Sequence, residues 1–409
     1  GSTLAFNDED GNYKPLPFTT TRSTSATRVN KEGLIEVVTN DRPRIDYTDT
    51  SDGVLLLENA ATNLITYSEA FDNAYWTKSG SSVTSGFASP DGNNNAFKLV
   101  EGTNTGTHYL KSSTISGGAI TPHSISIIAK PNGRGWINLR DNNTGSTGVW
   151  FDITNGVVGT EEGTASGSIE SLANGFYRCK NTYTNASANR IPLLALAEAD
   201  NDNSYTGDGT SGVYIYGAQL ELGSYPTSYI PTQGSAVTRL ADTASGSGNS
   251  EVFSDSSGVL FVDISAFSET NSFEAISIND NSTTDRIFMG YYSDDLYITV
   301  VDGGQAKYDV NTPINVKQNN KIAVKYKAQD FSFYLNGFEI DASVGINGGT
   351  TPSGLSQLSF NRGDAVEPFY GKTKEIGYYN TILTDLELET LTSYSSLSEL
   401  VTELNLNTL

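Results

Sequence analysis

Short runs of alternating apolar and polar residues, separated by glycine, asparagine and aspartate, recur along most of the chain. In the clearest run, residues 212–222, every even position from 214 onward is apolar, whereas Gln219 and Glu221 occupy odd positions. A period of two is the pattern of a β-strand, whose side chains point alternately to opposite faces of a sheet. The run therefore predicts the closing strand of a β-sandwich, with its even positions in the core and its odd positions on the other face.

The composition changes after residue 232, where two Xaa-Pro pairs are followed by a stretch rich in Thr, Ser, Gly and Ala. A chain of 409 residues is also too long for a single core. We therefore predict an all-β protein with two β-sandwich (jelly-roll) domains in tandem. The predicted divisions are an extended N-terminal segment at 1–60, the first sandwich at 61–232, a linker at 233–257, the second sandwich at 258–392 and a tail at 393–409.

Local signals add detail to this outline. The first segment has too few apolar residues for a core of its own, so we expect it to pack on the next domain or on a partner chain. Asn336-Gly337 between two strand-like runs predicts a type I′ hairpin. Thr384 and Glu387 form a capping box that predicts a short C-terminal helix. Leucines in the tail have helical spacing, which fits a short amphipathic helix or a frayed end.

Charge and rare residues exclude several classes of function. With 25 basic and 47 acidic residues the net charge is −22, which repels phosphate backbones and anionic lipids, so we expect neither nucleic-acid nor membrane binding. No apolar run approaches the ~20 residues of a membrane span, and we see no signal peptide. Two histidines, His108 and His123, argue against a multi-histidine zinc site or a Ser-His-Asp triad. The single cysteine, Cys179, is expected to be a buried small hydrophobe.

Several segments resemble modules that recur in bacteriophage tail and other virion structural proteins. Between residues 18 and 240 they read, in order, TRSTSATRVNKEG, PRIDY, GVLLLENAATNLITYSEAFDNAYWTKSG and GAQLELGSYPTSYIPT. The first sandwich is also similar to jelly-roll carbohydrate-binding modules, and residues 258–392 resemble a concanavalin A-like or laminin G-like sandwich. The resemblance implies a virion protein made in the host cytoplasm, with polysaccharide and other virion proteins as partners. Fibre proteins are commonly symmetric homo-oligomers, so we expect a trimer.

Two neighbouring runs, 135–141 and 148–154, offer a candidate sugar-binding face. Carbohydrate sites combine flat aromatic rings, which pack on C–H patches, with a few fixed polar groups. If the runs pair as an antiparallel hairpin, Ile137 and Leu139 lie on the core side. The opposite side would carry Trp136, Asn138, Arg140, Trp150 and Asp152. Alternatively, a second layer or a neighbouring subunit covers these tryptophans. The third tryptophan, Trp76, is expected in the core.

An acidic loop suggests a metal site. It places Asp200, Asp202 and Asp208 among Asn, Ser and Gly, and oxygen ligands of this kind suit Ca²⁺, which takes 6–8 of them. A structural Ca²⁺ is therefore one expectation, and a solvated turn is the alternative. Asp91, in a Pro-Asp-Gly-Asn turn, is a second candidate ligand.

Nothing in the sequence points firmly to catalysis. Glu339 and Asp341 begin a paired-carboxylate pattern of glycan hydrolases but lack its closing glutamate, and residues 258–392 contain no histidine for a lyase. We expect a protein that is not an enzyme. Three functions remain open: a carbohydrate-binding tail-fibre or receptor-binding protein, a purely structural decoration or fibre component, and a polysaccharide depolymerase or lyase.

Overall fold

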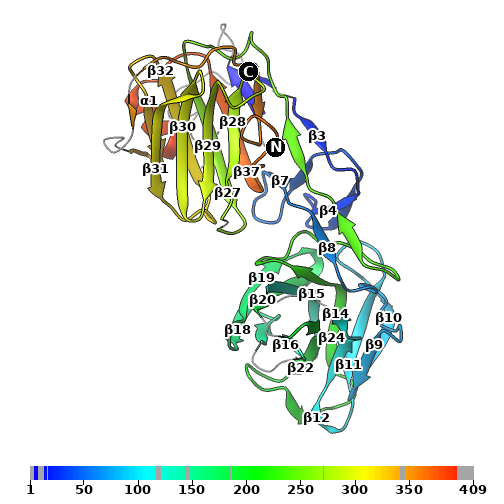
Figure 1. Ribbon diagram of the computed structural model, residues 1–409. Coiled ribbons are helices and arrows are strands. Elements are labelled where there is room, and N and C mark those ends of the chain that lie inside the picture. The colour runs from blue at the N-terminus through cyan, green and yellow to red at the C-terminus, as the bar shows by residue number, and fades with distance from the viewer. Residues whose placement is uncertain are drawn as a thin grey trace.

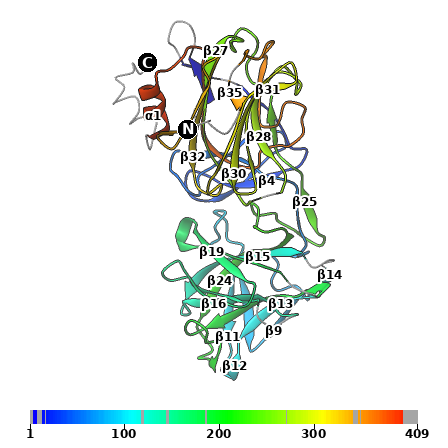
Figure 2. The ribbon, with the colours of Figure 1, turned by 60° about the vertical axis from the view of Figure 1, so that its left-hand side comes forward.

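The computed structural model describes residues 4–7, 13–15, 17–116, 121–143, 147–184, 187–269, 271–340, 346–347 and 349–393. These residues form two β-sandwiches joined by extended chain (Figures 1 and 2). The α-helix among them is α1, Asp385–Ser393, and the 3₁₀ turn is η1, Ala173–Gly175. The predicted all-β fold with tandem sandwiches is confirmed. Within the described chain, no helix has the length and apolar character of a membrane span.

The first sandwich, the lower body in Figure 1, consists of two six-stranded antiparallel sheets. The β24 sheet is ordered β10 (Ser81–Phe87), β11 (Ala96–Glu101), β24 (Gly212–Leu222), β15 (Pro122–Asn132), β20 (Tyr177–Thr184) and β19 (Ser166–Ser171). The β16 sheet is ordered β18 (Val157–Glu161), β17 (Val149–Asp152), β16 (Trp136–Asp141), β22 (Pro192–Ala197), β13 (Tyr109–Ser112) and β9 (Trp76–Ser79). Two short pairs flank them: β12 (Thr105–Thr107) with β23 (Ser204–Thr206), and β14 (Ile115–Ser116) with β21 (Asn189–Arg190). As predicted, Trp76 and Cys179 lie in the core between the sheets.

The closing strand β24 has the predicted bounds, but the faces of its first half, before Gly217, were assigned wrongly. Val213 and Ile215, at odd positions, face the core, and only after Gly217 do even positions such as Ala218 do so. Gly217 has φ 59°, and the pairing with β15 shifts register there, so a β-bulge changes the phase of the alternation. The other face is also buried: Gln219 is covered by the following loop and accepts a hydrogen bond from the Ile230 amide at 2.6 Å.

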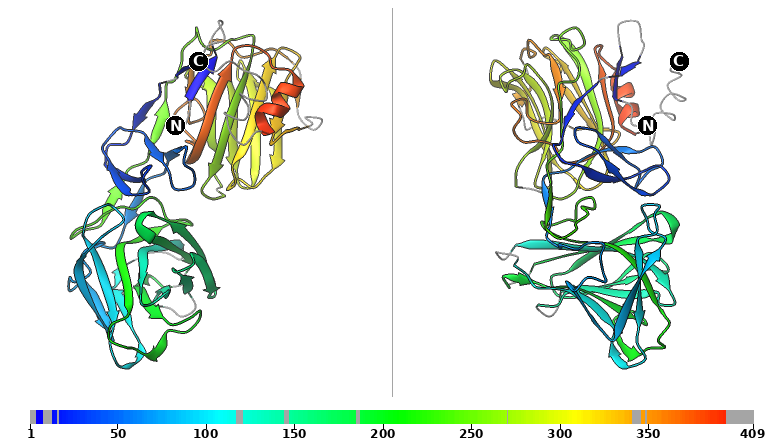
Figure 3. Two further views of the ribbon diagram at one scale, coloured as in Figure 1. Left: turned by 180° about the vertical axis from the view of Figure 1, so that it is seen from behind. Right: turned by 90° about the vertical axis from the view of Figure 1, so that its right-hand side faces the viewer.

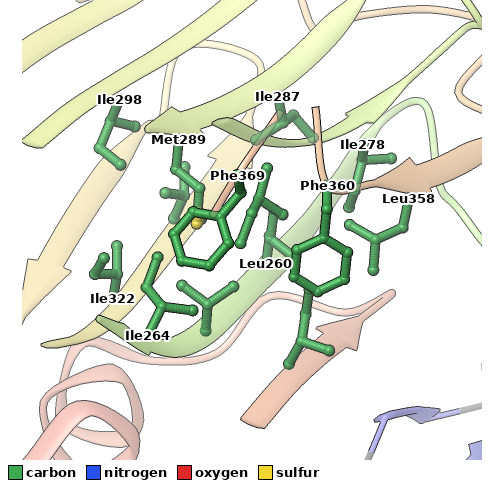
Figure 4. Close-up of a cluster of buried hydrophobic side chains, with 14 of the residues drawn as sticks. Leu260, Ile264, Ile278, Ile287, Met289, Ile298, Ile322, Leu358, Phe360 and Phe369 are labelled. Atoms are coloured by element: carbon green, nitrogen blue, oxygen red, sulfur yellow. The ribbon is translucent and has the colours of Figure 1, made fainter. Parts of the chain in front are cut away.

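The second sandwich, the upper body in Figure 1, packs a nine-stranded sheet on a six-stranded one. The larger sheet contains β1 (Leu4–Asn7), β2 (Tyr13–Pro15), β6 (Arg44–Asp46), β7 (Val54–Leu57), β27 (Ser257–Ala266), β32 (Asn320–Lys327), β33 (Ser332–Leu335), β34 (Phe338–Glu339) and β37 (Gly371–Tyr379). The smaller sheet contains β28 (Glu274–Asn279), β29 (Arg286–Tyr292), β30 (Asp295–Asp302), β31 (Gln305–Pro313), β35 (Ile346–Asn347) and β36 (Gln357–Ser359). Side chains of both sheets, such as Met289, fill the core together with Phe360 and Phe369 of the connection between β36 and β37 (Figure 4).

Two local predictions in the second sandwich are confirmed. Asn336 and Gly337 both have positive φ, 50° and 89°, and connect β33 to β34 as a type I′ turn requires. The Thr384 amide donates to Glu387 Oε2 at 2.7 Å and Thr384 Oγ1 accepts from the Glu387 amide at 3.3 Å, so the capping box precedes α1. The tail after residue 393, with its predicted helix, and Asp341 lie outside the described residues.

The first segment packs on both sandwiches (Figure 3). Its hairpin, β4 (Ala26–Val29) with β5 (Ile35–Val38), places Ile35 against the first sandwich, as expected for contact with the next domain. Its strand β7, however, pairs with β37 and thus extends a sheet of the second sandwich. The sequence VLLL of β7 is buried at every position. Such a strand needs cover on both faces, which the first sandwich alone does not provide.

The predicted linker is structured. Its strand β25 (Val237–Arg239) pairs with β8 (Ala61–Asn63), and β26 (Thr243–Ser245) pairs with β3 (Thr19–Thr21). The chain therefore passes between the sandwiches twice, and the two passages run antiparallel, side by side.

A buried ion network holds these passages together, and we call it the junction network. It consists of Arg22, Arg44, Glu58, Arg239 and Asp242. Arg44 Nη1 lies 2.7 Å from Glu58 Oε2, its Nη2 contacts Asp242, and all five side chains are at most 6 % exposed. Although burial disfavours its charge, the two arginines at Glu58 hold the pKa of this carboxyl well below its usual range. The network joins the first segment to the linker, and backbone groups such as the Glu58 amide, which donates to Asp242 Oδ2 at 2.9 Å, add to it.

A different carboxyl near the junction, Glu274 of β28, makes no hydrogen bond or ion pair with the described residues. Burial raises its pKa to about 8. Because the unfolded carboxyl titrates near ~4.3, this group costs no stability below that pH, and its cost grows as the pH rises toward 8.

We therefore expect Glu274→Gln to stabilise the protein by about 1–3 kcal/mol at pH 8.5 and to have little effect at pH 4.5. Thermal unfolding of both proteins at the two pH values measures this difference. Glu339→Gln, at an exposed position, is the control and should change neither value. Equal stability of Glu274→Gln and the parent protein at pH 8.5 would show that the Glu274 carboxyl is not isolated.

Candidate carbohydrate-binding site

The predicted hairpin of the candidate sugar site forms as expected. β16 and β17 pair antiparallel, with Trp136 opposite Asp152 and Asn138 opposite Trp150. Ile137 and Leu139 face the core, together with the alternate residues of the second strand. The five predicted site residues therefore share the outer face of the β16 sheet.

Three of these five residues are nevertheless buried, so the prediction of an open platform that includes them is wrong. Trp150 is only 2 % exposed, and Asn138 is completely buried. The carboxylate of Asp152 accepts hydrogen bonds from the Thr154 and Asn155 amides, at 2.9 and 3.1 Å, and thus caps the turn after β17. These side chains build the sheet and do not meet solvent.

The cover over this end of the sheet comes from β18 and from the acidic loop. A Cβ atom at Gly159 would lie 2.7 Å from Cζ3 of Trp136 and 2.6 Å from Asp200 Oδ1, so glycine is needed where the chain crosses the indole. Asp200 accepts hydrogen bonds from the amide and hydroxyl of Thr160, at 2.9 and 3.0 Å. Gly159 and Asp200 thus lie next to the indole of Trp136, which is half-buried.

The two remaining predicted residues, Trp136 and Arg140, are half-buried and reach the surface. Arg140 Nε donates to the buried Asn138 Oδ1 at 2.6 Å, which fixes the guanidinium. Its Nη2 lies 4.0 Å from Glu162 Oε1. A rigid arginine and a carboxylate beside an indole provide both hydrogen-bond donors and acceptors for hydroxyl groups.

Strand β13 adds two surface residues that the sequence analysis missed. Tyr109 and Lys111 flank the core residue Leu110 and so face outward, and the Lys111 ammonium lies 6.0 Å from the Tyr109 ring centre. The alternation in Tyr-Leu-Lys indicates in the sequence that Tyr109 and Lys111 share a face. Their position near β16 follows only from strand pairing, because Tyr109 pairs with Ala195 of β22 and Ala195 pairs with Asn138 of β16.

We call the resulting surface the outer patch. Its members are Tyr109, Lys111, Trp136, Arg140 and Glu162. Between its two aromatic rings, β22 contributes only Ala195 and Ala197, which are completely buried. With two strand spacings of ~4.8 Å each, β13 and β16 lie about 10 Å apart. The outer patch therefore presents two aromatic side chains on one face, with charged groups beside them.

The second sandwich has an aromatic cluster on the outer face of its smaller sheet, which was also missed. The ring of Phe273 lies 4.9 Å from that of Tyr292 and 5.1 Å from that of Tyr297, and all three are half-buried. Burial raises the pKa of Tyr297, and the nearby Asp295 adds to this effect. The alternation in Phe-Met-Gly-Tyr-Tyr and Leu-Tyr-Ile-Thr-Val is visible in the sequence. The sequence does not show that the rings of Phe273, Tyr292 and Tyr297 come into contact.

The structure does not bring the predicted metal ligands together. Asp200 is engaged with Thr160, and Asp208 accepts from the amides of Thr210 and Ser211 at 2.6 and 2.7 Å. Hydrogen bonds from Ser211 hold the pKa of Asp208 well below its usual range. Asp202 belongs to the turn that begins at Ala199. No group of three or more His, Cys, Asp or Glu side chains able to hold a metal occurs among the described residues.

Comparisons with known proteins concern the architecture alone. No protein-family model matches the chain, and no curated protein matches it significantly. Among solved structures, the CBM40 module of the Ruminococcus gnavus IT-sialidase, bound to α2,3-sialyllactose, is 16% identical with a TM-score of 0.30, over 36% of this chain and 94% of that one.

Two other solved structures span more of the chain. Domains LG4-5 of the mouse laminin α1 chain are 8% identical with a TM-score of 0.23, over 68% of this chain and 86% of that one. The tandem CBM22-1–CBM22-2 of Paenibacillus barcinonensis Xyn10C is 11% identical with a TM-score of 0.26, over 80% of this chain and 100% of that one. At these scores none of the similarities assigns a ligand to this chain.

Proposed function

We propose that the chain is a non-catalytic carbohydrate-binding protein of a virion, of the tail-fibre or receptor-binding kind, that recognises host or environmental polysaccharide. The observation that supports binding is the outer patch, in which Trp136 and Tyr109 share one face with the fixed guanidinium of Arg140. Aromatic rings next to rigid hydrogen-bonding groups are the combination that sugars require. The virion assignment rests on the sequence resemblance of residues 18 to 240.

Retention on immobilised bacterial and algal polysaccharides tests this proposal. We expect the parent protein to be retained on at least one of them and Trp136→Ala to lose at least tenfold in affinity, because stacking on an aromatic side chain contributes about 1–3 kcal/mol. Phe338→Ala removes a 72 % exposed ring of the second sandwich and is the matched control. Retention that survives Trp136→Ala but is lost in Tyr297→Ala would move the site to the second sandwich. A protein that is retained on none of them would favour a structural role.

The non-catalytic part of the proposal has its own support. Asp263 and Glu375 are cross-strand neighbours in the β27–β37 pair, but Asp263 is only 2 % exposed and cannot reach a polymer. Glu339 is exposed on the edge strand β34, where an acid needs no special explanation. Incubation with the retained polysaccharide should therefore release no reducing or unsaturated ends.

The proposed trimer and the structural Ca²⁺ are tested in the same preparations. Light scattering should give three times the mass of one chain, and a monomer would remove the trimer from the proposal. A loss of retention in EDTA would add calcium to the site or its support, and unchanged retention would remove it.

A further inference from the structure

A recess of about 230 Å³ lies where the first segment, the first sandwich and the second sandwich meet. The first segment contributes residues such as Val29 and Leu56, the first sandwich contributes Arg178 and Tyr225, and the second contributes Phe267 and Lys372. The volume is below the ~300 Å³ at which pockets for drug-sized ligands begin, and it suits a single ring.

The recess has an aromatic wall. The rings of Tyr225 and Phe267 stack with their centres 5.1 Å apart and their planes 25° apart, and both side chains are half-buried. Tyr225 belongs to the loop after β24, and Phe267 follows β27. Each sandwich therefore supplies one ring, and a ring face that is turned away from the other ring can receive the C–H patch of a sugar.

Cations also line the recess, although the protein as a whole has a net charge of −22. Arg28, Arg178, Lys180 and Lys372 line the recess, together with the carboxylates of Asp46, Glu58 and Glu170. Of these carboxylates, Glu58 belongs to the junction network and Asp46 accepts from the Val29 amide at 2.8 Å. Burial opposes ionisation of Glu170, but Lys180, Arg178 and Lys372 lower its pKa to about 2. One carboxylate is thus surrounded by three cations.

Arg178 is the group that points to a ligand. Its side chain is buried, with the residue 7 % exposed, and is fixed by hydrogen bonds from Nη2 to the Thr227 carbonyl at 2.7 Å and to Ser126 Oγ at 3.1 Å. Its Nε also points to Ser126 Oγ, at 3.4 Å. The third nitrogen, Nη1, makes no hydrogen bond to any residue that the structure describes. A buried, immobilised guanidinium with one donor nitrogen left over is suited to bind an anionic oxygen.

We propose that this recess binds one hexuronic acid residue of an acidic polysaccharide, with the sugar ring on the Tyr225–Phe267 wall and its carboxylate at Arg178 Nη1. Lys180 and Lys372 line the rim, where Lys180 contacts Glu170 and Lys372 contacts Asp49, so each would exchange part of its ion pair for the ligand. The site is separate from the outer patch and does not depend on it. Since the two rings come from different sandwiches, the ligand also ties the two bodies together.

Titration calorimetry with trigalacturonate, an alginate trisaccharide and a hyaluronan tetrasaccharide tests the proposal. We expect at least one of them to bind the full chain, to weaken with added NaCl, and to bind at least tenfold more weakly once its carboxylates are methyl-esterified. Lys372→Gln and Tyr225→Ala should each reduce the affinity several-fold or more. Phe338 lies in neither the recess nor the outer patch, so Phe338→Ala should leave the affinity unchanged. Affinity that is lost in Trp136→Ala but kept in Lys372→Gln and Tyr225→Ala would place the acid at the outer patch and contradict the recess, so failure here and failure of the outer patch are distinguishable.

Three outcomes would overturn the proposal: no binding of any of the three acids by the folded chain, equal binding of acid and methyl ester, or displacement of the sugar by an equal concentration of acetate. Arg178→Lys keeps the charge but removes the planar donor, so it should weaken binding while thermal unfolding confirms that the protein is folded. If Arg178→Lys does not fold, Lys372→Gln and Tyr225→Ala decide the matter, and unchanged affinity in both would contradict the site.

Discussion

Replacing Arg44 with methionine is expected to lower the stability of the protein by about 3–5 kcal/mol, because it removes the arginine that makes the shortest contacts to Glu58 and leaves two buried carboxylates with only the longer contacts of Arg239 in common. Arg44 is completely buried and binds Glu58 and Asp242 at once. Methionine fills much of the same volume but brings no charge. Thermal and denaturant unfolding of the parent protein and the variant measure this loss of stability. We expect the contacts at the junction to be lost before either sandwich unfolds.

Arg28→Met is the control for this experiment. Arg28 pairs with Glu36 at 3.0 Å, but both side chains are substantially exposed, and exposed pairs contribute about 0–1 kcal/mol. If Arg44→Met is no more destabilising than Arg28→Met, the junction network does not hold the two passages of chain together.

The same network predicts how stability depends on acid. The pKa of Glu58 is lowered in the folded protein, so its contribution is fully present above the unfolded value of ~4.3 and is lost as the pH falls below it. We therefore expect the parent protein and Arg44→Met to differ most at neutral pH. Their difference should shrink in strong acid.

Replacing Trp150 with alanine is the second change for which we expect a large effect, about 3–5 kcal/mol of lost stability. Trp150 is 2 % exposed and lies on the face of β17 opposite the core residues Val149 and Phe151. Its Nε1 has no hydrogen-bond partner among the described residues, so Trp150→Phe removes no bond and should cost much less.

Trp136→Ala is the companion to this experiment because Trp136 lies opposite the other end of the same strand and reaches the surface. It should reduce carbohydrate binding but cost less stability than Trp150→Ala. Denaturant unfolding of the two variants measures the difference. Equal destabilisation would mean that both indoles are structural and that the outer patch is a packed surface.

The pairing of β16 with β17 could be predicted from sequence because it depends on local alternation and a short connection. The burial of Trp150 could not, because the alternation of β17 fits an exposed outer face as well as a covered one. For Trp136 the one local hint was Gly159, but a glycine between strand-like residues does not reveal which ring it accommodates.

The faces of β24 could not be predicted in full for a different reason. The alternation in the sequence is continuous, yet the bulge at Gly217 exchanges the faces halfway along the strand. Only the register against β15 reveals this. The position of β7 beside β37, more than 300 residues apart in the chain, likewise depends on pairing between distant segments. Its uninterrupted apolar sequence indicated only that both of its faces would be buried.

The most direct test of carbohydrate binding is a crystal structure of the protein with the oligosaccharide that it retains. We predict a sugar ring stacked on Trp136 or Tyr109, with a hydroxyl group within hydrogen-bonding distance of Arg140. A sugar bound away from the outer patch, or an outer patch occupied by a neighbouring subunit in the assembled particle, would contradict the account.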